Sequence, residues 1–525
     1  MSNHSQLTAW LAELTYVRGR FERDLALVTD GRTGRVVSLT RAAEIDSLKL
    51  DPAARVVRLP NRALLPGMVN AHSHAFQRAI RGRTEFRTAA RDTFWTWREM
   101  MYRAAASLSP EDLYDASRMA FLEMALSGIT TVSEFHYLHH SPDGTPYDDP
   151  NLLAKQVVRA ARDVGVRIAL LRVAYARSGF RAEPNPRQSR FITPAAADFL
   201  KHLDALSADL ARDYETHGDD DKNASASADA PHSGRDSSAR SRAVAPAPGR
   251  NVSAEISSGS VAWAGVAPHS VRAVPLEYLR EVTAHARSKP LVVHMHVAEQ
   301  PAENEACVSE HGRTPVALLA DENFLDERFT AVHAVHITAE EARALAGSNV
   351  CACPTTERNL GDGVVPADLL FDAGARVALG TDSHAQIDLL EDARELEYHL
   401  RLQKLSRAVL APQMSADEDH EHSQTSALAA RLFDCATTSG ARSLGFDGGS
   451  LRAGAAADFF TVALDDPSIA GAGDDDLLPA VVFSLARAAV RDTVVAGRAV
   501  VERNRHPAQD EIVSRFAALQ HKLWA

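Results

Sequence analysis

The chain between Ala63 and Ala385 alternates short apolar runs with longer amphipathic stretches. The apolar runs are rich in valine, isoleucine and alanine and become polar mainly at their carboxyl ends, which is typical of parallel strands buried on both faces. They predict eight strands: Ala63–His72, Gly128–Phe135, Val166–Tyr175, Val261–Pro268, Leu291–Ala298, Phe329–Val335, Asn349–Pro354 and Ala375–Asp382. The stretches between them have helical periodicity, for example in Asp112–Ser127, Asn151–Val164, Thr193–Tyr214 and Pro275–Arg287.

This alternation predicts an α/β fold. Eight strands interleaved with helices match a (β/α)8 barrel better than an open, doubly wound sheet. No glycine-rich phosphate-binding motif follows the first strand, so a dinucleotide-binding fold has no support. We expect the barrel to span residues 63–445.

Both ends of the chain differ from this central part. Residues 1–62 and 446–525 contain short strand-like segments between turn signals, and we expect them to form one small β-sandwich beside the barrel. The expected strands are Leu25–Thr29, Arg35–Leu39, Ala54–Arg58, Ala457–Ala463, Val481–Phe483, Asp492–Ala496 and Arg498–Glu502. An amphipathic helix, Asp510–Trp524, is expected to close the chain.

Two polar stretches are expected to lie outside the packed core. Residues 217–260 are dominated by serine, alanine, arginine and proline, and only Val244, Val252 and Ile256 are large aliphatics. Such a stretch cannot bury enough apolar surface to offset the entropy lost on ordering, so we predict disorder. It follows a helix and precedes a strand, which places it on the amino-terminal face of a barrel, away from the usual site. The run Ser415–Ser426 is expected to be a surface loop.

Composition excludes several classes of function. The 525 residues include 57 lysines and arginines against 69 aspartates and glutamates, a net charge of −12, whereas nucleic-acid binding needs a basic face. Four cysteines are too few for a disulfide framework. No run of 18 apolar residues predicts a membrane span, and no apolar run near the amino terminus resembles a signal peptide. A cytoplasmic location is therefore expected.

Metal-binding residue types recur where the predicted strands end. The first strand ends in His72-Ser73-His74, and residues i and i+2 of an extended segment point the same way, so both imidazoles can face one point. Three other strands end in similar residues. The fifth ends in His294 and His296, the sixth in His333 and His336, and the eighth in Asp382, with His384 close behind. Because the carboxyl ends of barrel strands meet at one mouth, these residues predict a transition-metal site.

These motifs resemble the amidohydrolase superfamily, specifically its mononuclear deaminase-like branch. The resemblance is carried by Pro66–His74, His296–Glu299, His333, Gly380–Asp382 and Gly449–Asp458. It implies a TIM-like barrel of the metallo-dependent hydrolase type and one divalent metal ion, usually zinc, held by His72, His74, His296 and Asp382. It gives no role to His294 and His336, which we interpret as packing residues or as residues that support the ligands from behind.

Two further points concern the metal. Binuclear members of the superfamily bridge their metals with a carboxylated lysine, and no lysine lies between Lys222 and Lys289, so one metal ion is expected. Zinc, iron and manganese all stay open, because nitrogen and oxygen ligands accept several metals.

The resemblance also implies hydrolytic loss of ammonia. A metal-bound water is acidified to a pKa of about 7, which gives hydroxide at neutral pH. Asp382 can take the proton of this water, and Glu299, three residues beyond His296, can carry it to the leaving nitrogen. His333 can hydrogen-bond the hydroxide or the developing tetrahedral centre.

Within the superfamily, several segments are similar to the formimidoylglutamate deiminases. They are His74–Arg78, Phe94–Met100, Glu134–His140, Ala267–Arg272, His296–Pro301 and Cys353–Gly363. This similarity implies a small-molecule substrate with two carboxylates. It implies that Gln77, Arg98, Tyr137 and Arg272 contact the glutamate part and that His269 contacts the formimidoyl end. Arginine suits this task because its guanidinium group binds carboxylates bidentately.

Two alternatives remain at this point. The chain could be another mononuclear amidohydrolase, such as a guanine deaminase or a triazine-type hydrolase, although an arginine-lined mouth suits a neutral flat base poorly. More remotely, it could be a non-catalytic barrel scaffold, which would be expected to lose the metal residues that are present here. The family resemblance also suggests a homodimer.

Overall fold

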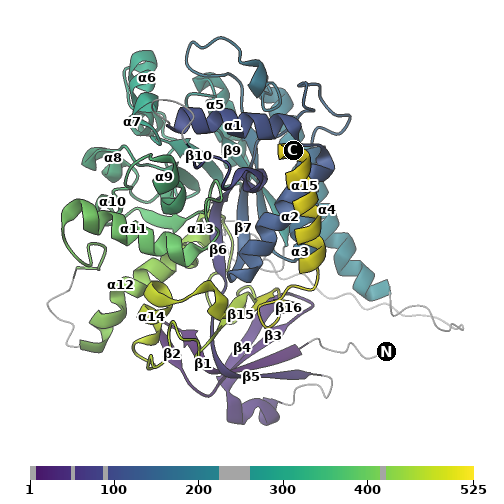
Figure 1. Ribbon diagram of the computed structural model, residues 1–525, viewed down its shortest axis with the longest axis vertical. Helices are drawn as coiled ribbons and strands as arrows, with labels where there is room; N and C mark the ends of the chain where they lie inside the picture. Colours follow the sequence, from purple (N-terminus) through teal and green to yellow (C-terminus); the bar gives the residue numbers. More distant parts are fainter. Residues whose placement is uncertain (1–6, 49–53, 87–92, 224–260, 414–420) are drawn as a thin grey trace, which may run out of the picture.

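The centre of the structure is an eight-stranded parallel sheet in the order β13-β12-β11-β10-β9-β8-β7-β6 (Figure 1). The structure is a computed structural model and describes residues 7–48, 54–86, 93–223, 261–413 and 421–525. The strands are β6 (Met68–Ser73), β7 (Ile129–His136), β8 (Arg167–Ala174), β9 (Ala262–Pro268), β10 (Val293–Val297), β11 (Phe329–His333), β12 (Asn349–Ala352) and β13 (Arg376–Leu379). An isolated parallel bridge between Ser73 and Asp382 joins the first strand to the end of the last. The predicted (β/α)8 barrel is confirmed.

Helices surround this barrel, and α1 (Phe94–Ser107) crosses its upper end in the view of Figure 1. They are α1 (Phe94–Ser107), α2 (Pro110–Leu126), α3 (Leu152–Val164), α4 (Ala196–Asn223), α5 (Leu276–Ser288), α6 (Pro301–His311), α7 (Pro315–Asp321), α8 (Ala339–Ala344), α9 (Pro354–Leu360), α10 (Ala367–Ala373), α11 (Leu389–Lys404), α12 (Glu421–Ala436) and α13 (Thr438–Ser443). Local sequence sets their ends. Ser109 and Asp112 form a reciprocal capping box at the start of α2, and Gly165 ends α3 with a φ of 88°, which favours glycine.

Both chain ends build a second sheet, in the order β16-β15-β14-β5-β1-β3-β4, with β2 paired to β1. Its strands are β1 (Leu7–Val17), β2 (Arg20–Glu22), β3 (Leu25–Asp30), β4 (Arg35–Arg41), β5 (Arg55–Pro66), β14 (Phe459–Ala463), β15 (Val490–Val495) and β16 (Arg498–Val501). Arg35 bridges to Ala456, so the sheet folds over an interior that includes Trp10, Leu27 and Phe459. The prediction that both chain ends contribute to one small β-structure beside the barrel is therefore confirmed, and this structure is one folded sheet.

The connection between the two sheets positions the first barrel strand. β5 crosses the expected boundary at residue 62 and leads through Gly67 into β6, so the single strand expected over Ala63–His72 is two strands. A Cβ atom at Gly67 would lie 2.3 Å from Oγ1 of Thr130 on β7, which is closer than atoms can pack. Glycine is required here by this close approach.

Three expectations about secondary structure are wrong. Val481–Phe483 is part of helix α14 (Leu477–Ser484), not a strand; a short run that is apolar on every side does not distinguish the two. The predicted disorder does not begin at His217, because α4 continues to Asn223 and an established helix gains one hydrogen bond per added residue. The polar run from Ser415 is not entirely a loop, since α12 begins at Glu421 and good helix formers can be polar. Residues 224–260 and 414–420 lie outside the described parts of the chain.

The carboxyl-terminal helix α15 (Gln509–Trp524) braces the short helix η2 (Ala75–Ile80), which follows β6. The side chains of Gln520 and Trp524 both donate to the carbonyl oxygen of Ala79, at 2.9 and 3.2 Å. Among the described residues, no helix is both long and apolar enough to cross a bilayer. The cytoplasmic location and the homodimer stay predictions.

A buried ion pair joins the two sheets, and we expect it to stabilise the folded protein. Arg167 of β8 donates to both carboxylate oxygens of Asp458, at 2.7 and 3.0 Å, and both side chains are almost fully buried. Asp458→Ala should lower the free energy of unfolding by about 3–5 kcal/mol, because it leaves a buried guanidinium without its carboxylate. Thermal or urea unfolding would measure the change.

The matched control is Asp321→Ala, which removes the partner of Arg313 from an ion pair exposed by about 60% on both sides. Its cost should stay below about 1 kcal/mol, the usual limit for a surface pair. Equal effects of the two substitutions would contradict a structural role for the Arg167–Asp458 pair.

Candidate active site

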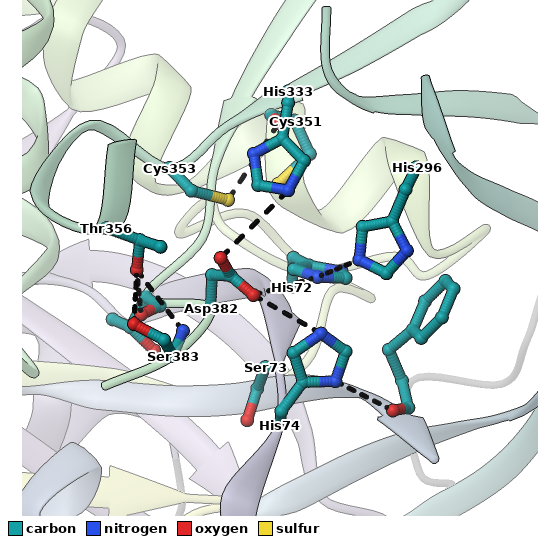
Figure 2. A network of polar contacts seen from close by, with 12 residues as sticks. His72, Ser73, His74, His296, His333, Cys351, Cys353, Thr356, Asp382 and Ser383 are labelled. Atoms are coloured by element: carbon teal, nitrogen blue, oxygen red, sulfur yellow. Dashed lines mark hydrogen bonds and ion pairs between the residues drawn. The ribbon is translucent and has the colours of Figure 1, made fainter. Parts of the chain in front are cut away.

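The predicted metal-binding residues converge at the carboxyl-terminal mouth of the barrel (Figure 2). His72 and His74 leave the end of β6, and the Nε2 atoms of both lie 3.3 Å from Oδ1 of Asp382. His296 of β10 places its Nε2 atom 3.2 Å from that of His72. His333 of β11 is more distant, with Nε2 at 4.0 Å from Oδ2 of Asp382.

Hydrogen bonds behind the ring nitrogens fix how His74 and His296 present their lone pairs. Nδ1 of His74 donates to the carbonyl of Phe135 at 3.0 Å, and Nδ1 of His296 donates to the carbonyl of His269 at 3.1 Å. In the neutral rings, the Nε2 lone pairs therefore face the cluster, which is the arrangement of metal-binding histidines.

The charge states fit a divalent cation. Burial lowers the pKa of His72 to about 3 and also lowers the pKa values of His74 and His296, so these rings are neutral at pH 7. Burial alone would raise the pKa of Asp382, but the neighbouring His72 and His74 hold it well below its usual range. Neutral imidazoles beside an ionised carboxylate are the donor types of a zinc site. The tightest group of possible ligand atoms consists of His72, His296, His333 and Asp382, and His74 lies beside it, at 3.3 Å from Asp382.

A second group of acids surrounds His333. Oε1 of Glu299 lies 3.7 Å from its Nε2 atom, and Oε1 of Glu357 lies 3.2 Å from its Nδ1 atom. Burial would lower the pKa of His333, but Glu299 and Glu357 raise it well above the usual value, which favours an imidazolium. Burial also raises the pKa of Glu299, so this carboxyl can hold a proton near neutral pH.

The backbone is strained where these side chains enter the site. Ala298, His333, Ala334 and Asp382 have φ values of 52°, 73°, 50° and 43°, in the left-handed region that residues other than glycine rarely adopt. Each follows or ends a barrel strand. Such strain typically clusters at functional sites, where the surrounding structure holds it in place.

The sequence analysis missed two carboxylates that support the site from behind. Glu134 accepts hydrogen bonds from the Ser73 hydroxyl at 2.7 Å and from the backbone of Ala75 at 2.8 Å, so it holds the segment that carries His72 and His74. Glu357 orients His333 and also accepts from the backbone of Cys353 at 2.9 Å. Both lie within segments already noted for their resemblance, which was the available signal.

A cavity with an empty volume of about 560 Å³ opens from the metal-binding residues towards solvent. Its lining includes every residue expected to contact substrate, namely Gln77, Arg98, Tyr137, His269 and Arg272, together with Glu299, His333 and Asp382. Nε2 of Gln77 donates to the Tyr137 hydroxyl at 2.8 Å. His294 and His336 lie apart from the cluster. Their Nε2 atoms donate to the backbone carbonyl oxygens of Ser443 and Asp362, respectively.

The two arginines of this cavity have no carboxylate partner. Within the described parts of the chain, neither Arg98 nor Arg272 forms an ion pair, and the Nε atoms of both are buried without a hydrogen bond. Aromatic faces hold them instead: the guanidinium carbons lie 4.5 and 5.8 Å from the ring of Trp95. Glu303 and Glu299 act on the Arg272 guanidinium only from beyond ion-pair distance. Two cations in one cavity without a close carboxylate are suited to an anionic ligand.

Comparisons with known proteins agree with this geometry. The family model described as "Amidohydrolase family" matches residues 63–500. The chain is 36% identical over 464 residues to the formimidoylglutamate deiminase of Pseudomonas aeruginosa, covering 88% of this chain and 89% of that protein. It is 24% identical to a 5-methylthioadenosine/S-adenosylhomocysteine deaminase of Natronomonas pharaonis, covering 91% and 89%. The crystal structure of an amidohydrolase from Brucella melitensis superposes with a TM-score of 0.79 at 30% identity, covering 99% of this chain and 100% of that one.

Metal retention tests the donor set. The purified protein should carry about one equivalent of divalent metal, and His296→Ala should weaken its retention more than about tenfold, since even indirect contacts to a metal are worth that much. Metal content after dialysis, measured by mass spectrometry, gives the answer. The control is His336→Ala, whose ring hydrogen-bonds to the backbone of Asp362 outside the cluster. If His296→Ala retains the metal as well as His336→Ala does, His296 is not a metal ligand and the predicted set of ligands is wrong.

Proposed function

Because the chain belongs to the amidohydrolase family, we propose that it hydrolyses N-formimidoyl-L-glutamate to N-formyl-L-glutamate and ammonia. That it is an enzyme, a hydrolase of carbon–nitrogen bonds, follows from the family and from the relative at 36% identity. The proposal concerns the substrate. The single observation that carries it is the pair of unpaired arginines in a cavity that ends at the metal-binding residues.

A substrate with two carboxylates fits this cavity better than an uncharged ring. Arg98 and Arg272 are held by aromatic faces, so their charges are free for a ligand. A dicarboxylate supplies both counter-charges, whereas a neutral purine would leave two partly buried cations uncompensated. Gln77 and Tyr137, joined by their own hydrogen bond, can complete the contacts to the amino-acid part.

The metal site follows from the same residues. His72, His74, His296 and Asp382 would hold one divalent ion, with zinc the first choice for this donor set. When bound, such an ion lowers the pKa of a water molecule and so makes hydroxide available near neutral pH.

Asp382 and Glu299 carry out different proton transfers in the proposed reaction. Asp382, ionised next to the histidines, accepts the proton of the attacking water. A carbon–oxygen bond forms at the formimidoyl carbon, its carbon–nitrogen double bond becomes single, and protonated Glu299 gives its proton to the terminal nitrogen. The proton held by Asp382 then passes to Glu299, which restores both carboxyl groups. The second water proton then moves to the same nitrogen as the bond breaks and ammonia leaves. His333, positively charged and 3.7 Å from Glu299, stabilises negative charge on the oxygen.

Which nitrogen leaves is decided by position. The tetrahedral centre carries two nitrogens, one terminal and one bonded to glutamate. The arginines hold the glutamate part on their side of the cavity, so the terminal nitrogen is the one presented to Glu299. His269 lines the cavity beside His296 and is placed to contact the formimidoyl end.

The reaction is tested by ammonia release from the metal-loaded protein, with N-formimidoyl-L-glutamate and guanine in parallel. We expect turnover of the first only, and Glu299→Gln should lower kcat by about 10²–10⁴-fold, the usual contribution of a positioned acid–base group. Turnover of guanine alone would contradict the substrate assignment, and full activity of Glu299→Gln would contradict the proton transfer.

The arginines are tested separately. Arg98→Met and Arg272→Met keep much of the side-chain bulk, and each should lower kcat/KM for N-formimidoyl-L-glutamate by about 10–100-fold, because a hydrogen bond to a charged group is lost. Arg313→Met removes an exposed arginine far from the cavity lining and serves as the control. Unchanged kcat/KM in both cavity variants would show that the substrate carboxylates bind elsewhere.

A further inference from the structure

One group of residues in the cavity has no part in the reaction described so far. Tyr102 of α1 and Tyr175, directly after β8, line the same cavity as Arg98 and Arg272. Both hydroxyls accept hydrogen bonds from a single side-chain amide, because Nε2 of Gln188 lies 2.6 Å from the Tyr102 oxygen and 2.8 Å from the Tyr175 oxygen. Gln188 lies in the short helix η3 (Pro186–Gln188).

One of the two tyrosine O–H groups has no hydrogen-bond acceptor within this group. The amide of Gln188 spends both hydrogens on the two hydroxyl oxygens. The Tyr102 and Tyr175 hydroxyls also act on each other, so at most one phenol proton can be taken up between the two oxygens. A phenol that accepts a hydrogen bond still donates its own proton. Because Nε2 of Gln188 faces both hydroxyls and its partnerless Oε1 does not, the second phenol proton has no acceptor within this group. A ligand in the cavity can supply one.

The surroundings favour an anionic acceptor. Arg272 and Arg98 are the charged groups that act most strongly on the Tyr175 hydroxyl, and burial raises the pKa of this hydroxyl, so it stays protonated as a donor. A carboxylate has about four lone-pair sites, which can accept from guanidinium and hydroxyl groups together. An O–H donor beside the arginines completes such a set without adding charge.

The group is held rigidly, as a binding wall requires. Rings of Tyr102 and Tyr175 both lie 5.9 Å from the ring of Phe191, which is almost fully buried. The guanidinium of Arg190 binds the carbonyl oxygens of Ala105 and Leu108 at the end of α1. These contacts fasten the loop that carries Gln188 to the helix that carries Tyr102.

We propose that Tyr102 and Tyr175 form a carboxylate-binding pair in the substrate cavity, oriented by Gln188 and acting beside Arg98 and Arg272. The inference rests on the proposed function for its substrate but concerns only how one carboxylate is bound. Tyr102 and Tyr175 are binding residues in this account, and Gln188 is a positioning residue.

The test pairs hydroxyl deletions in the protein with carboxylate deletions in the ligand. Binding of N-formyl-L-glutamate, N-formyl-L-norvaline and N-formyl-4-aminobutyrate to the metal-loaded protein is measured by calorimetry; the second lacks the side-chain carboxylate and the third the α-carboxylate. Tyr102→Phe and Tyr175→Phe should each weaken N-formyl-L-glutamate binding by about tenfold or more, the value of a hydrogen bond to a charged group. For the monocarboxylate that lacks the carboxylate bound by the hydroxyls, Tyr→Phe should no longer weaken binding. The ligand for which the effect disappears therefore identifies the carboxylate that the pair binds.

Two further variants separate this role from a structural one. Tyr278→Phe deletes a buried hydroxyl that donates to the carbonyl of Thr193 at 3.1 Å outside the cavity, and it should leave binding of all three ligands unchanged. Gln188→Leu should raise KM for N-formimidoyl-L-glutamate by about tenfold while kcat changes little, since only orientation of the binding pair is lost.

The outcomes distinguish the two proposals. Equal losses for all three ligands, or none for N-formyl-L-glutamate, would overturn the carboxylate-binding pair whatever the activity. Hydroxyl-dependent binding without turnover of N-formimidoyl-L-glutamate would support the pair and contradict the proposed reaction.

Discussion

The closure of the barrel between β6 and β13 is the contact on which the site depends. The backbone nitrogen of Asp382 donates to the carbonyl of His72, and that of His74 donates to the carbonyl of Asp382, both at 3.0 Å. These two hydrogen bonds finish the sheet and, in the same step, bring the aspartate beside both histidines of the first strand. Gly380 makes the approach possible, because a Cβ atom there would lie 2.7 Å from that of His72. The contact that closes the barrel therefore also places Asp382 beside His72 and His74.

The cavity that results has two parts, one at its inner end with the predicted metal ligands and one further out with the arginines. At its inner end, neutral histidines and ionised Asp382 gather, with the His333 imidazolium between Glu299 and Glu357. Further out, Arg98 and Arg272 lie over aromatic rings and, among the described residues, form no close ion pair with a carboxylate. Under the proposed function, the carboxylates of the substrate would neutralise these cations, which would favour acids over neutral compounds.

Much of this could be predicted from the sequence, and the misses have physical causes. The barrel strands are buried on both faces, so their apolar runs and the polar residues that end them stand out, and the histidines of β6, β10 and β11 were found on that basis. β1 was missed because its burial alternates irregularly along eleven residues at the centre of the small sheet. Glu134 and Glu357 act through other residues across the barrel, and such contacts leave no periodic signal. The Tyr102–Gln188–Tyr175 group joins three separate segments for the same reason.

The account's central claim is that one cavity binds a metal ion at its inner end and a dicarboxylate further out. A crystal structure of the metal-loaded protein with N-formyl-L-glutamate, with anomalous data collected at the absorption edge of the metal, tests it most directly. The account predicts one anomalous peak among His72, His74, His296 and Asp382, and ligand carboxylates at Arg98 and Arg272. A peak elsewhere, or a ligand whose carboxylates face solvent away from both arginines, would contradict it.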